Sequence, residues 1–427
     1  MARQDAHDGG SYLKGLPDRV ASGEGGVIAS SGLRLLADEL LLPAAVLKRS
    51  ALETNRRWMR EFLQKTGVLL CPHGKTTMSP ELFAMQLEDG AWGLTAATAH
   101  HVRLYVRMGV KRILMANQLV GRANIEAVAS IIAERPDVEF YCLVDSVRGV
   151  VQLSEGMRRC APGRRVSVLL EVGAPGQRTG ARDLEAVLEI ASCCAANRDA
   201  VRLSGVETFE GVFTAMADPD AAVCGLLDFL GEAAREIDRR GLFDSDEVMI
   251  TAGGTAFFDL AAGAIRDPRL SRPVLQVIRS GCYLTHDSSL YERSFTRILE
   301  RSGHLGALGR FEPALEVWGH VQSRPEATRL IASVGKRDIG SDAGFPVPVW
   351  VFSPGRDASP RSCQGEASVA ALYDQHACLD VPADFKAEVG DLIAFGVSHP
   401  CTTFDKWKAI VVVDDDYRVI DMVSTAF

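Results

Sequence analysis

The chain has 427 residues, of which 47% are hydrophobic and 24% are charged, and its formal net charge is −8. This composition is typical of a globular protein with two domains or one large domain. An acidic chain without a run of lysine or arginine does not favour nucleic-acid binding. No apolar stretch approaches the roughly 20 residues that a membrane span needs. Ten cysteines without paired spacing, after a polar N-terminus, predict a reducing cytoplasmic location.

Short apolar runs alternate with amphipathic stretches through the first 300 residues. Helical spacing of apolar residues is clear at 47–65 and again at 221–241. Strand–helix alternation predicts an α/β protein with a parallel sheet. Eight such units predict a closed (β/α)8 barrel, with an open doubly wound sheet as the alternative. The eight predicted strands are 68–73, 92–98, 112–117, 139–146, 166–173, 201–208, 247–254 and 274–281.

The pattern changes after about residue 305, where short β-type runs are separated by Gly, Pro and Asp. This pattern predicts a C-terminal all-β domain at 306–427, which leaves 38–305 for the barrel. The sequence VDDDYRV at 413–419 predicts a hairpin within that domain. The Pro- and Asp-containing segments around 340–363 are expected to be exposed loops.

Several polar or glycine-rich segments follow predicted barrel strands, where side chains face the mouth of the barrel. Lys75 follows the first strand, and Arg178 lies in the glycine-rich loop EVGAPGQRTG. The segments TAGGT (251–255) and RSGCY (279–283) follow two further strands, and their glycines allow backbone N–H groups to approach an anion. Each feature alone also fits a solvated lysine or an ordinary turn. Together they predict pyridoxal 5′-phosphate, an aldehyde held by Lys75 as a Schiff base.

A second cluster, GVSHPCTTFDKW, follows a strand-like run near the C-terminus. His399 and Cys401 are two residues apart, so in an extended chain they point to the same face. An imidazole and a thiolate in this arrangement suit one Zn²⁺ ion, with its other positions open to water or substrate. The alternative is a buried cysteine beside an unrelated histidine.

These motifs together resemble the fold-type III pyridoxal-phosphate enzymes. Within them, the chain is most similar to the D-serine dehydratase and D-threonine aldolase group, which are relatives of alanine racemase. The resemblance extends from about residue 38 to the C-terminus and is carried mainly by PHGKTT around Lys75 and by SHPCTTFDKW. It implies that the segment 1–37 joins the β-domain. It also implies a homodimer with active sites at the interface.

The resemblance assigns roles to individual residues. Lys75 would be the Schiff-base lysine, Arg178 would hydrogen-bond the phenolic oxygen of the cofactor, and His399 and Cys401 would hold the divalent metal. The phosphate cradle would comprise Gly253, Gly254, Thr255, Gly281 and Cys282, with Tyr283 beside it. There are three departures from the family pattern: Thr77 stands where many relatives have a second histidine, Phe209 stands where a tyrosine is common, and TAHHV at 98–102 replaces a more acidic pattern.

The metal pair also suggests a reaction, because in this family aldolases tend to have His-x-Asp and dehydratases His-x-Cys. Cys401 therefore favours a D-serine-type dehydratase, which converts a D-3-hydroxy amino acid into a 2-keto acid and ammonia. Lys75 would remove the Cα proton, and the metal would help the β-hydroxyl to leave. A D-threonine aldolase, which releases glycine and an aldehyde, is the main alternative. A racemase would need a second acid/base that the sequence does not identify, and a non-enzymatic carrier would not need the β-domain.

Overall fold

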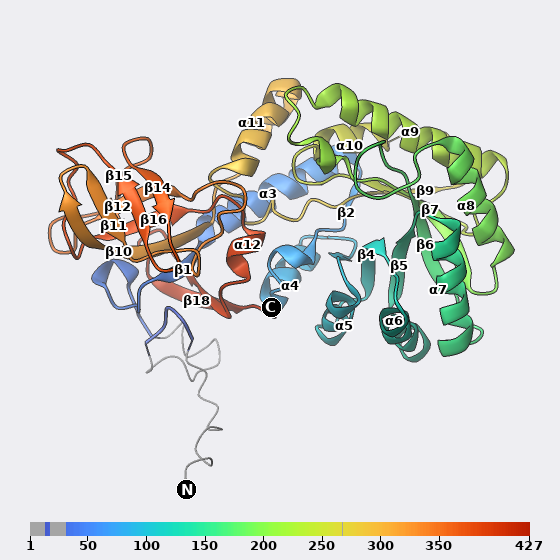
Figure 1. Ribbon diagram of the computed structural model, residues 1–427, viewed down its shortest axis with the longest axis horizontal. Helices are drawn as coiled ribbons and strands as arrows, with labels where there is room; N and C mark the ends of the chain where they lie inside the picture. Colours follow the sequence, from blue (N-terminus) through green and yellow to red (C-terminus); the bar gives the residue numbers. More distant parts are fainter. Residues whose placement is uncertain (1–12, 18–30, 267) are drawn as a thin grey trace, which may run out of the picture.

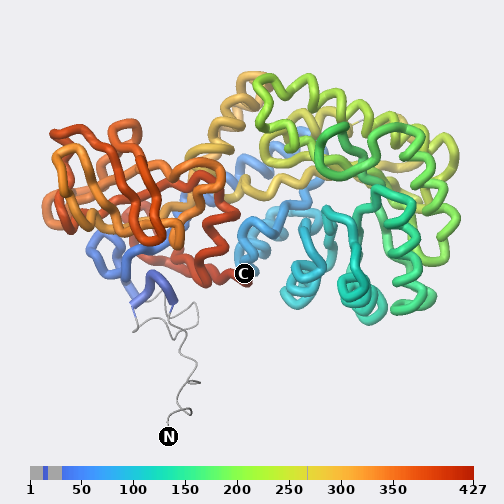
Figure 2. The backbone as a smooth tube through the Cα atoms, in the orientation of Figure 1, coloured from blue at the N-terminus to red at the C-terminus, as the bar shows by residue number. Residues whose placement is uncertain are grey.

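The computed structural model describes residues 13–17, 31–266 and 268–427. It consists of a barrel lobe and a strand-rich lobe that lie side by side and are joined by α3 and by the chain after α11 (Figure 1). The same two bodies are visible in the backbone trace, where the C-terminal end lies at the junction between them (Figure 2).

The barrel lobe contains eight parallel strands in the spatial order β2-β9-β8-β7-β6-β5-β4-β3. Each predicted strand is present, although most are shorter than predicted, so the predicted barrel is confirmed. The strands are β2 (Leu69–Leu70), β3 (Leu94–Ala96), β4 (Arg112–Gln118), β5 (Glu139–Val144), β6 (Val166–Glu171), β7 (Val201–Glu207), β8 (Val248–Ala252) and β9 (Val274–Ile278).

The helices of this lobe alternate with the strands and cover the outside of the sheet (Figure 1). The two helices with the clearest sequence signal are observed as α3 and α9, within two residues of the predicted ends. The helices are α3 (Arg49–Thr66), α4 (Pro80–Glu88), α5 (Ala99–Arg107), α6 (Arg122–Glu134), α7 (Val147–Cys160), α8 (Leu184–Ala196), α9 (Asp220–Arg239), α10 (Phe258–Ala264) and α11 (Leu290–Arg301). Short 3-10 turns are η1 (Leu35–Ala37), η2 (Gly74–Thr76), η3 (Glu210–Phe213) and η4 (Gly303–Leu308).

The sheet closes between β2 and β3 just before Lys75. His73 forms a parallel bridge with Thr95, whose N–H donates to the Pro72 carbonyl at 2.8 Å. The inside of the barrel is filled by apolar side chains from the strands and their ends, as in a packed barrel rather than a pore. This inner cluster is Cys71, Leu114, Leu143, Leu169, Met249 and Val277.

The strand-rich lobe contains a sheet in the order β13-β12-β16-β10-β1-β17-β18, extended from β10 through β11, β15 and β14. The predicted hairpin at 413–419 joins the antiparallel strands β17 and β18. The strands are β1 (Ala44–Lys48), β10 (Leu315–Glu326), β11 (Arg329–Ala332), β12 (Val347–Phe352), β13 (Arg361–Ser362), β14 (Ser368–Leu372), β15 (Ala377–Asp380), β16 (Leu392–Gly396), β17 (Ala409–Val413) and β18 (Val419–Ser424). One short helix, α12 (Cys401–Phe404), interrupts them.

Strand β1 lies within the range 38–305 that the sequence assigns to the barrel, but it belongs to the other lobe. It pairs antiparallel with β10 and parallel with β17, because its apolar residues are buried in that sheet. The structural boundary therefore lies between β1 and α3. Of the segment 1–37, the described parts pack on the β-domain through Leu16, Leu33 and Leu35, and the rest lies outside the described residues.

The Pro- and Asp-containing segments around 340–363 that were expected to be loops flank a strand at 347–352. This segment is β12, which pairs with β16 and is mostly buried, because its apolar residues face the β-domain core. Among the described residues, no helix is both long and apolar enough to cross a membrane.

Candidate active site

Lys75 lies in η2, directly after the closure of the barrel, and its side chain is exposed at the barrel mouth. The segment is held tightly on both sides. A Cβ atom on Gly281 would lie 2.7 Å from the Cβ of His73, and one on Gly74 would lie 2.5 Å from the hydroxyl of Tyr105. Two close backbone approaches therefore fix the position from which Lys75 extends.

A cleft at the barrel mouth brings Lys75 and Arg178 together, as the sequence predicted from their strand-end positions. Arg178 is exposed, and its guanidinium lies 4.6 Å from the ring centre of Phe209. The aromatic residue that departs from the family pattern therefore supports the arginine by a cation–π contact. The cleft is lined by His73, Lys75, Ala97, Ala116, Asn117, Leu143, Glu171, Arg178, Thr179, Glu207, Phe209 and Arg279.

The floor of this cleft is a buried ion pair that the sequence analysis did not identify. Arg279 Nη2 lies 2.5 Å from Glu207 Oε1 and donates to the Thr208 carbonyl at 2.8 Å, while Nη1 donates to Thr251 Oγ1 at 2.7 Å. Burial raises the pKa of Glu207 to about 8, although the neighbouring Arg279 acts in the opposite direction. Glu207 and Arg279 therefore place a buried, mutually paired charge couple in the same cleft as Lys75.

The cleft also contains buried polar atoms that have no hydrogen-bond partner among the residues that the structure describes. They include Glu207 Oε2, Arg279 Nε and His73 Nδ1. Burial, together with Lys75, lowers the pKa of His73 well below its usual value, so its imidazole is neutral. Because buried polar atoms normally have partners, these atoms indicate that the cleft accommodates a polar ligand. This observation fits a polar cofactor such as pyridoxal 5′-phosphate.

The two glycine N–H groups predicted to bind phosphate already have an acceptor. The N–H groups of Gly253 and Gly254 donate to Glu210 Oε2 and Oε1, at 3.0 and 2.6 Å. Glu210 is fully buried in η3, so these donors are not turned toward open space. Of the predicted cradle, Thr255 is only partly buried, and its hydroxyl accepts a long hydrogen bond from Ser280 Oγ at 3.5 Å.

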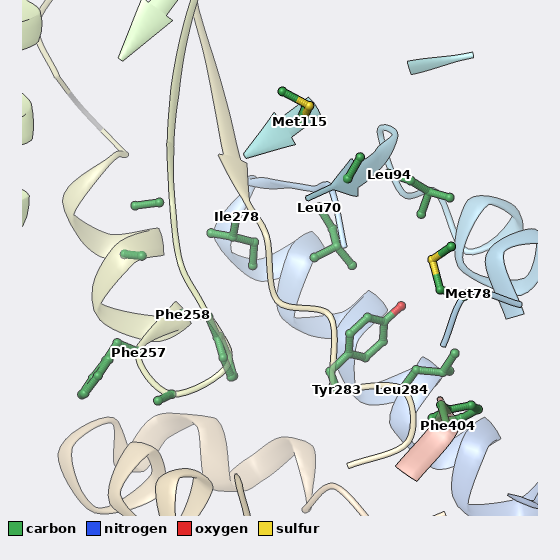
Figure 3. Close-up of a cluster of buried hydrophobic side chains, with 14 of the residues drawn as sticks. Leu70, Met78, Leu94, Met115, Phe257, Phe258, Ile278, Tyr283, Leu284 and Phe404 are labelled. Atoms are coloured by element: carbon green, nitrogen blue, oxygen red, sulfur yellow. The ribbon is translucent and has the colours of Figure 1, made fainter. Parts of the chain in front are cut away.

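The remaining cradle residues do not line the cleft beside Lys75. Gly281 packs under His73, and the Cys282 side chain points to the domain boundary, where its Sγ lies 3.7 Å from Thr76 Oγ1. Tyr283 is buried in the hydrophobic core near Leu70 and Leu284 (Figure 3), and burial raises the pKa of its hydroxyl. The side chains of Cys282 and Tyr283 thus lie apart from Lys75 and Arg178, which the cleft brings together.

The predicted metal pair does form one cluster. His399 hydrogen-bonds the Cys401 sulfur, and its Nδ1 lies 2.7 Å from Asp342 Oδ2. Burial lowers the pKa of His399, but Cys401 and Asp342 outweigh it and raise the pKa to about 9. The Cys282 thiol and His399 hold the pKa of Cys401 well below its usual value despite burial. A thiolate and an imidazole oriented by a carboxylate are a typical donor set for a borderline cation.

His399 and Cys401 lie at the start of α12, whose first residues connect the β-domain to the Lys75 segment. Cys401 Sγ lies 3.4 Å from Thr76 Oγ1, so the predicted metal pair and the predicted catalytic lysine share a boundary. Within the part of the chain that the structure describes, no three His, Cys, Asp or Glu side chains converge as a metal-binding group. The assignment of His399 and Cys401 as metal donors stays a prediction.

Four residues important for this geometry were missed from the sequence: Glu207, Glu210, Arg279 and Asp342. Glu207 ends β7 and Arg279 directly follows β9. Both are charged residues at the end of an apolar strand, and this pattern could have identified them as candidate site residues. Asp342 lies in the segment GSDAG, far from His399 in sequence, and no spacing rule connects them.

Comparisons with known proteins agree with this arrangement. Residues 314–413 match the protein family described as "Putative serine dehydratase domain". A D-threonine aldolase from Arthrobacter sp. is 24% identical over 377 residues, which make up 87% of this chain and 89% of that enzyme.

Two solved structures share the fold over nearly the whole chain. The D-threonine aldolase from Filomicrobium marinum has a TM-score of 0.74 at 24% identity, with 92% of this chain and 97% of that chain covered. The D-threo-3-hydroxyaspartate dehydratase from Delftia sp. HT23 has a TM-score of 0.69 at 21% identity, with 92% and 99% covered. Solved alanine racemase-like proteins also share the fold, which confirms the predicted barrel with a C-terminal β-domain.

Proposed function

We propose that this chain is a fold-type III pyridoxal-phosphate enzyme and, within that class, a metal-dependent dehydratase. It would convert a D-3-hydroxy amino acid into a 2-keto acid and ammonia, with D-serine as the simplest substrate. The coarser class is a pyridoxal-phosphate-dependent lyase acting on D-3-hydroxy amino acids, in line with the aldolases and dehydratases to which the chain is similar. The observation that favours dehydration is the pairing of His399 with a thiol, Cys401, instead of a carboxylate.

The protein groups around the cleft suit this reaction. Lys75 would bind the cofactor and serve as the base at Cα, because it extends into the cleft from a rigid segment. Arg178, supported by Phe209, would hold the cofactor's phenolic oxygen. When bound there, pyridoxal phosphate supplies an electron sink that stabilises negative charge at Cα.

The metal pair is the second element of the proposal. His399 and Cys401 would hold a divalent cation, for which a thiolate favours Zn²⁺ over Mg²⁺ or Ca²⁺. The chemistry that a cation supplies there is Lewis-acid assistance to the departing β-hydroxyl. Support comes from D-threo-3-hydroxyaspartate dehydratase, for which a cysteine-to-alanine mutant in the metal-free form and a histidine-to-alanine mutant have been solved.

A D-threonine aldolase is the second candidate, and the extent of similarity favours it. The Arthrobacter aldolase matches 87% of this chain, whereas the Delftia dehydratase matches 49% in sequence. An aldolase would use the same residues to deprotonate the β-hydroxyl and cleave the Cα–Cβ bond. The two candidates differ in their products, so product analysis separates them.

The test is to incubate the purified protein with D-serine, D-threonine and L-serine, and to measure keto acid, ammonia and glycine. A dehydratase gives equal amounts of keto acid and ammonia from a D-substrate, with no glycine. L-serine should be inert, because Lys75 reaches one face of the bound substrate. Glycine and an aldehyde as the main products would refute dehydration and establish the aldolase.

The metal's role is tested with a chelator and with Cys401→Ala. Both should abolish deamination while the protein keeps its yellow cofactor, because Lys75 and Arg178 lie in a separate cleft. Cys224→Ala, which removes an exposed thiol on α9, is the matched control and should be fully active. Full deamination by the chelated protein would show that the cation takes no part in the reaction.

A further inference from the structure

Two thiols from different lobes face each other at the domain boundary. Cys282 follows β9 in the barrel, and Cys401 begins α12 in the β-domain. Their sulfur atoms are 3.8 Å apart, although 119 positions separate them in the sequence. Both sulfurs also lie beside the Thr76 hydroxyl, at 3.7 Å from Cys282 and 3.4 Å from Cys401. Thr76, at the barrel mouth, therefore contacts both sulfur atoms and helps to keep them close together.

The two thiols have different surroundings. Cys401 is only partly buried, so its sulfur is the one of the two that an oxidant can reach. Cys282 is 4% exposed and so is poorly placed to meet an oxidant directly. It is well placed to attack a modified sulfur at Cys401. Cys401 is thus placed to be oxidised first, and Cys282 is placed to act as the resolving cysteine.

We propose that Cys282 and Cys401 are a peroxide-sensitive pair that forms a reversible disulfide between the barrel and the β-domain. Hydrogen peroxide would convert the Cys401 thiol to a sulfenic acid, with one peroxide oxygen bonded to sulfur and the other leaving as water with the thiol proton. The Cys282 sulfur would then attack the Cys401 sulfur, and the S–O bond would break. The hydroxide that leaves would take the Cys282 proton to form a second water. Two thiols are oxidised by two electrons, and one peroxide is reduced to two waters.

The geometry needs little movement for this step. The sulfurs would approach from 3.8 Å to the bond length of about 2.05 Å, by rotation of two side chains that are already in contact. The product removes Cys401 from the metal pair and ties the turn after β9 to α12. The loss of the metal rests on the proposed function, whereas formation of the disulfide does not.

The cross-link is tested on the full chain by mass spectrometry. Chelator-treated protein is exposed to hydrogen peroxide, its remaining thiols are alkylated, and it is digested without reductant. The expected product is a peptide containing Cys282 joined to one containing Cys401, which separates on addition of dithiothreitol. Cys401 oxidised to sulfinic acid without a linked peptide, or equal linkage among other cysteines, would overturn the proposal.

Two further arms separate the disulfide from the metal. In Cys282→Ser, Cys401 lacks its resolving partner and should accumulate irreversible oxidation, while Cys224→Ser should behave as wild type. Zinc added before peroxide should slow the formation of the link several-fold by covering Cys401. If the link forms equally fast with and without zinc, and the linked protein still binds zinc, the metal assignment fails while the thiol pair stands.

Discussion

Gly281 provides a direct test of how closely the barrel must hold its lysine. In Gly281→Ala, the new Cβ would lie 2.7 Å from the Cβ of His73, and 2.8 and 2.9 Å from its backbone O and N. Ordinary contact begins at 3.4 Å, so the two segments must separate by about 0.7 Å. The backbone of His73 cannot rotate away as a long side chain could. Lys75, two residues further along, must therefore move with it.

The cost of this shift has two parts. Overpacking of a well-packed region typically costs about 1–3 kcal/mol of stability. Displacement of a reacting group by about 1 Å can reduce the rate about 10²-fold. We therefore expect Gly281→Ala to unfold at a lower temperature and to lose up to about 10²-fold in kcat, with a smaller change in KM.

The matched control is Gly263→Ala in α10, where a Cβ meets nothing within 4 Å. That variant should retain wild-type activity and stability. The assay is steady-state kinetics on the preferred D-amino acid, combined with thermal unfolding of both variants. If Gly281→Ala is as active and as stable as Gly263→Ala, the close packing of Gly281 on His73 does not position Lys75, and our reasoning about the barrel mouth is wrong.

Four other outcomes are expected. Borohydride reduction should attach the cofactor to Lys75, as found by peptide mapping; attachment to another lysine would overturn the assignment. Arg178→Lys should keep the cofactor but lower turnover and shift the pH titration of the near-visible absorbance, because an ammonium lacks the planar fork of a guanidinium; unchanged kinetics would indicate a surface arginine. Asp342→Asn should weaken zinc binding about 10–100-fold in competition with a chromogenic chelator, because Asp342 orients His399; Asp374→Asn, at an exposed carboxylate, should not. Light scattering at assay concentration should give a dimer, and a fully active monomer would rule out an active site shared between subunits.

The barrel was predictable because its signal is local. Each strand is a short apolar run, and the order of strands in a parallel barrel follows the order in the chain. Strand β1 was assigned to the wrong lobe for the opposite reason. Its partners, β10 and β17, lie beyond the entire barrel in sequence, so no local pattern indicates that pairing.

The candidate site shows the same difference between features with a local sequence signal and features that depend on residues far apart in the sequence. Lys75 and Arg178 were predicted to meet because both follow barrel strands, and strand ends share one face. The phosphate cradle stays a prediction, because a sequence shows that an N–H can approach an anion but not that Glu210 already accepts from Gly253 and Gly254. Cys282 shows a similar limit of sequence reasoning. The sequence does not indicate that its side chain faces the domain boundary and not the cleft.

Strand β1 has a consequence for the order in which the protein can be built. It lies between β10 and β17, so its two edges cannot both be covered until residues 411–413 have been synthesised. The barrel strands are all complete by residue 278, much earlier in translation. A growing chain therefore holds an apolar strand without its partners through most of synthesis, which is the kind of edge that promotes aggregation. His399 and Cys401 lie between β16 and β17, so both are synthesised only after the barrel is complete.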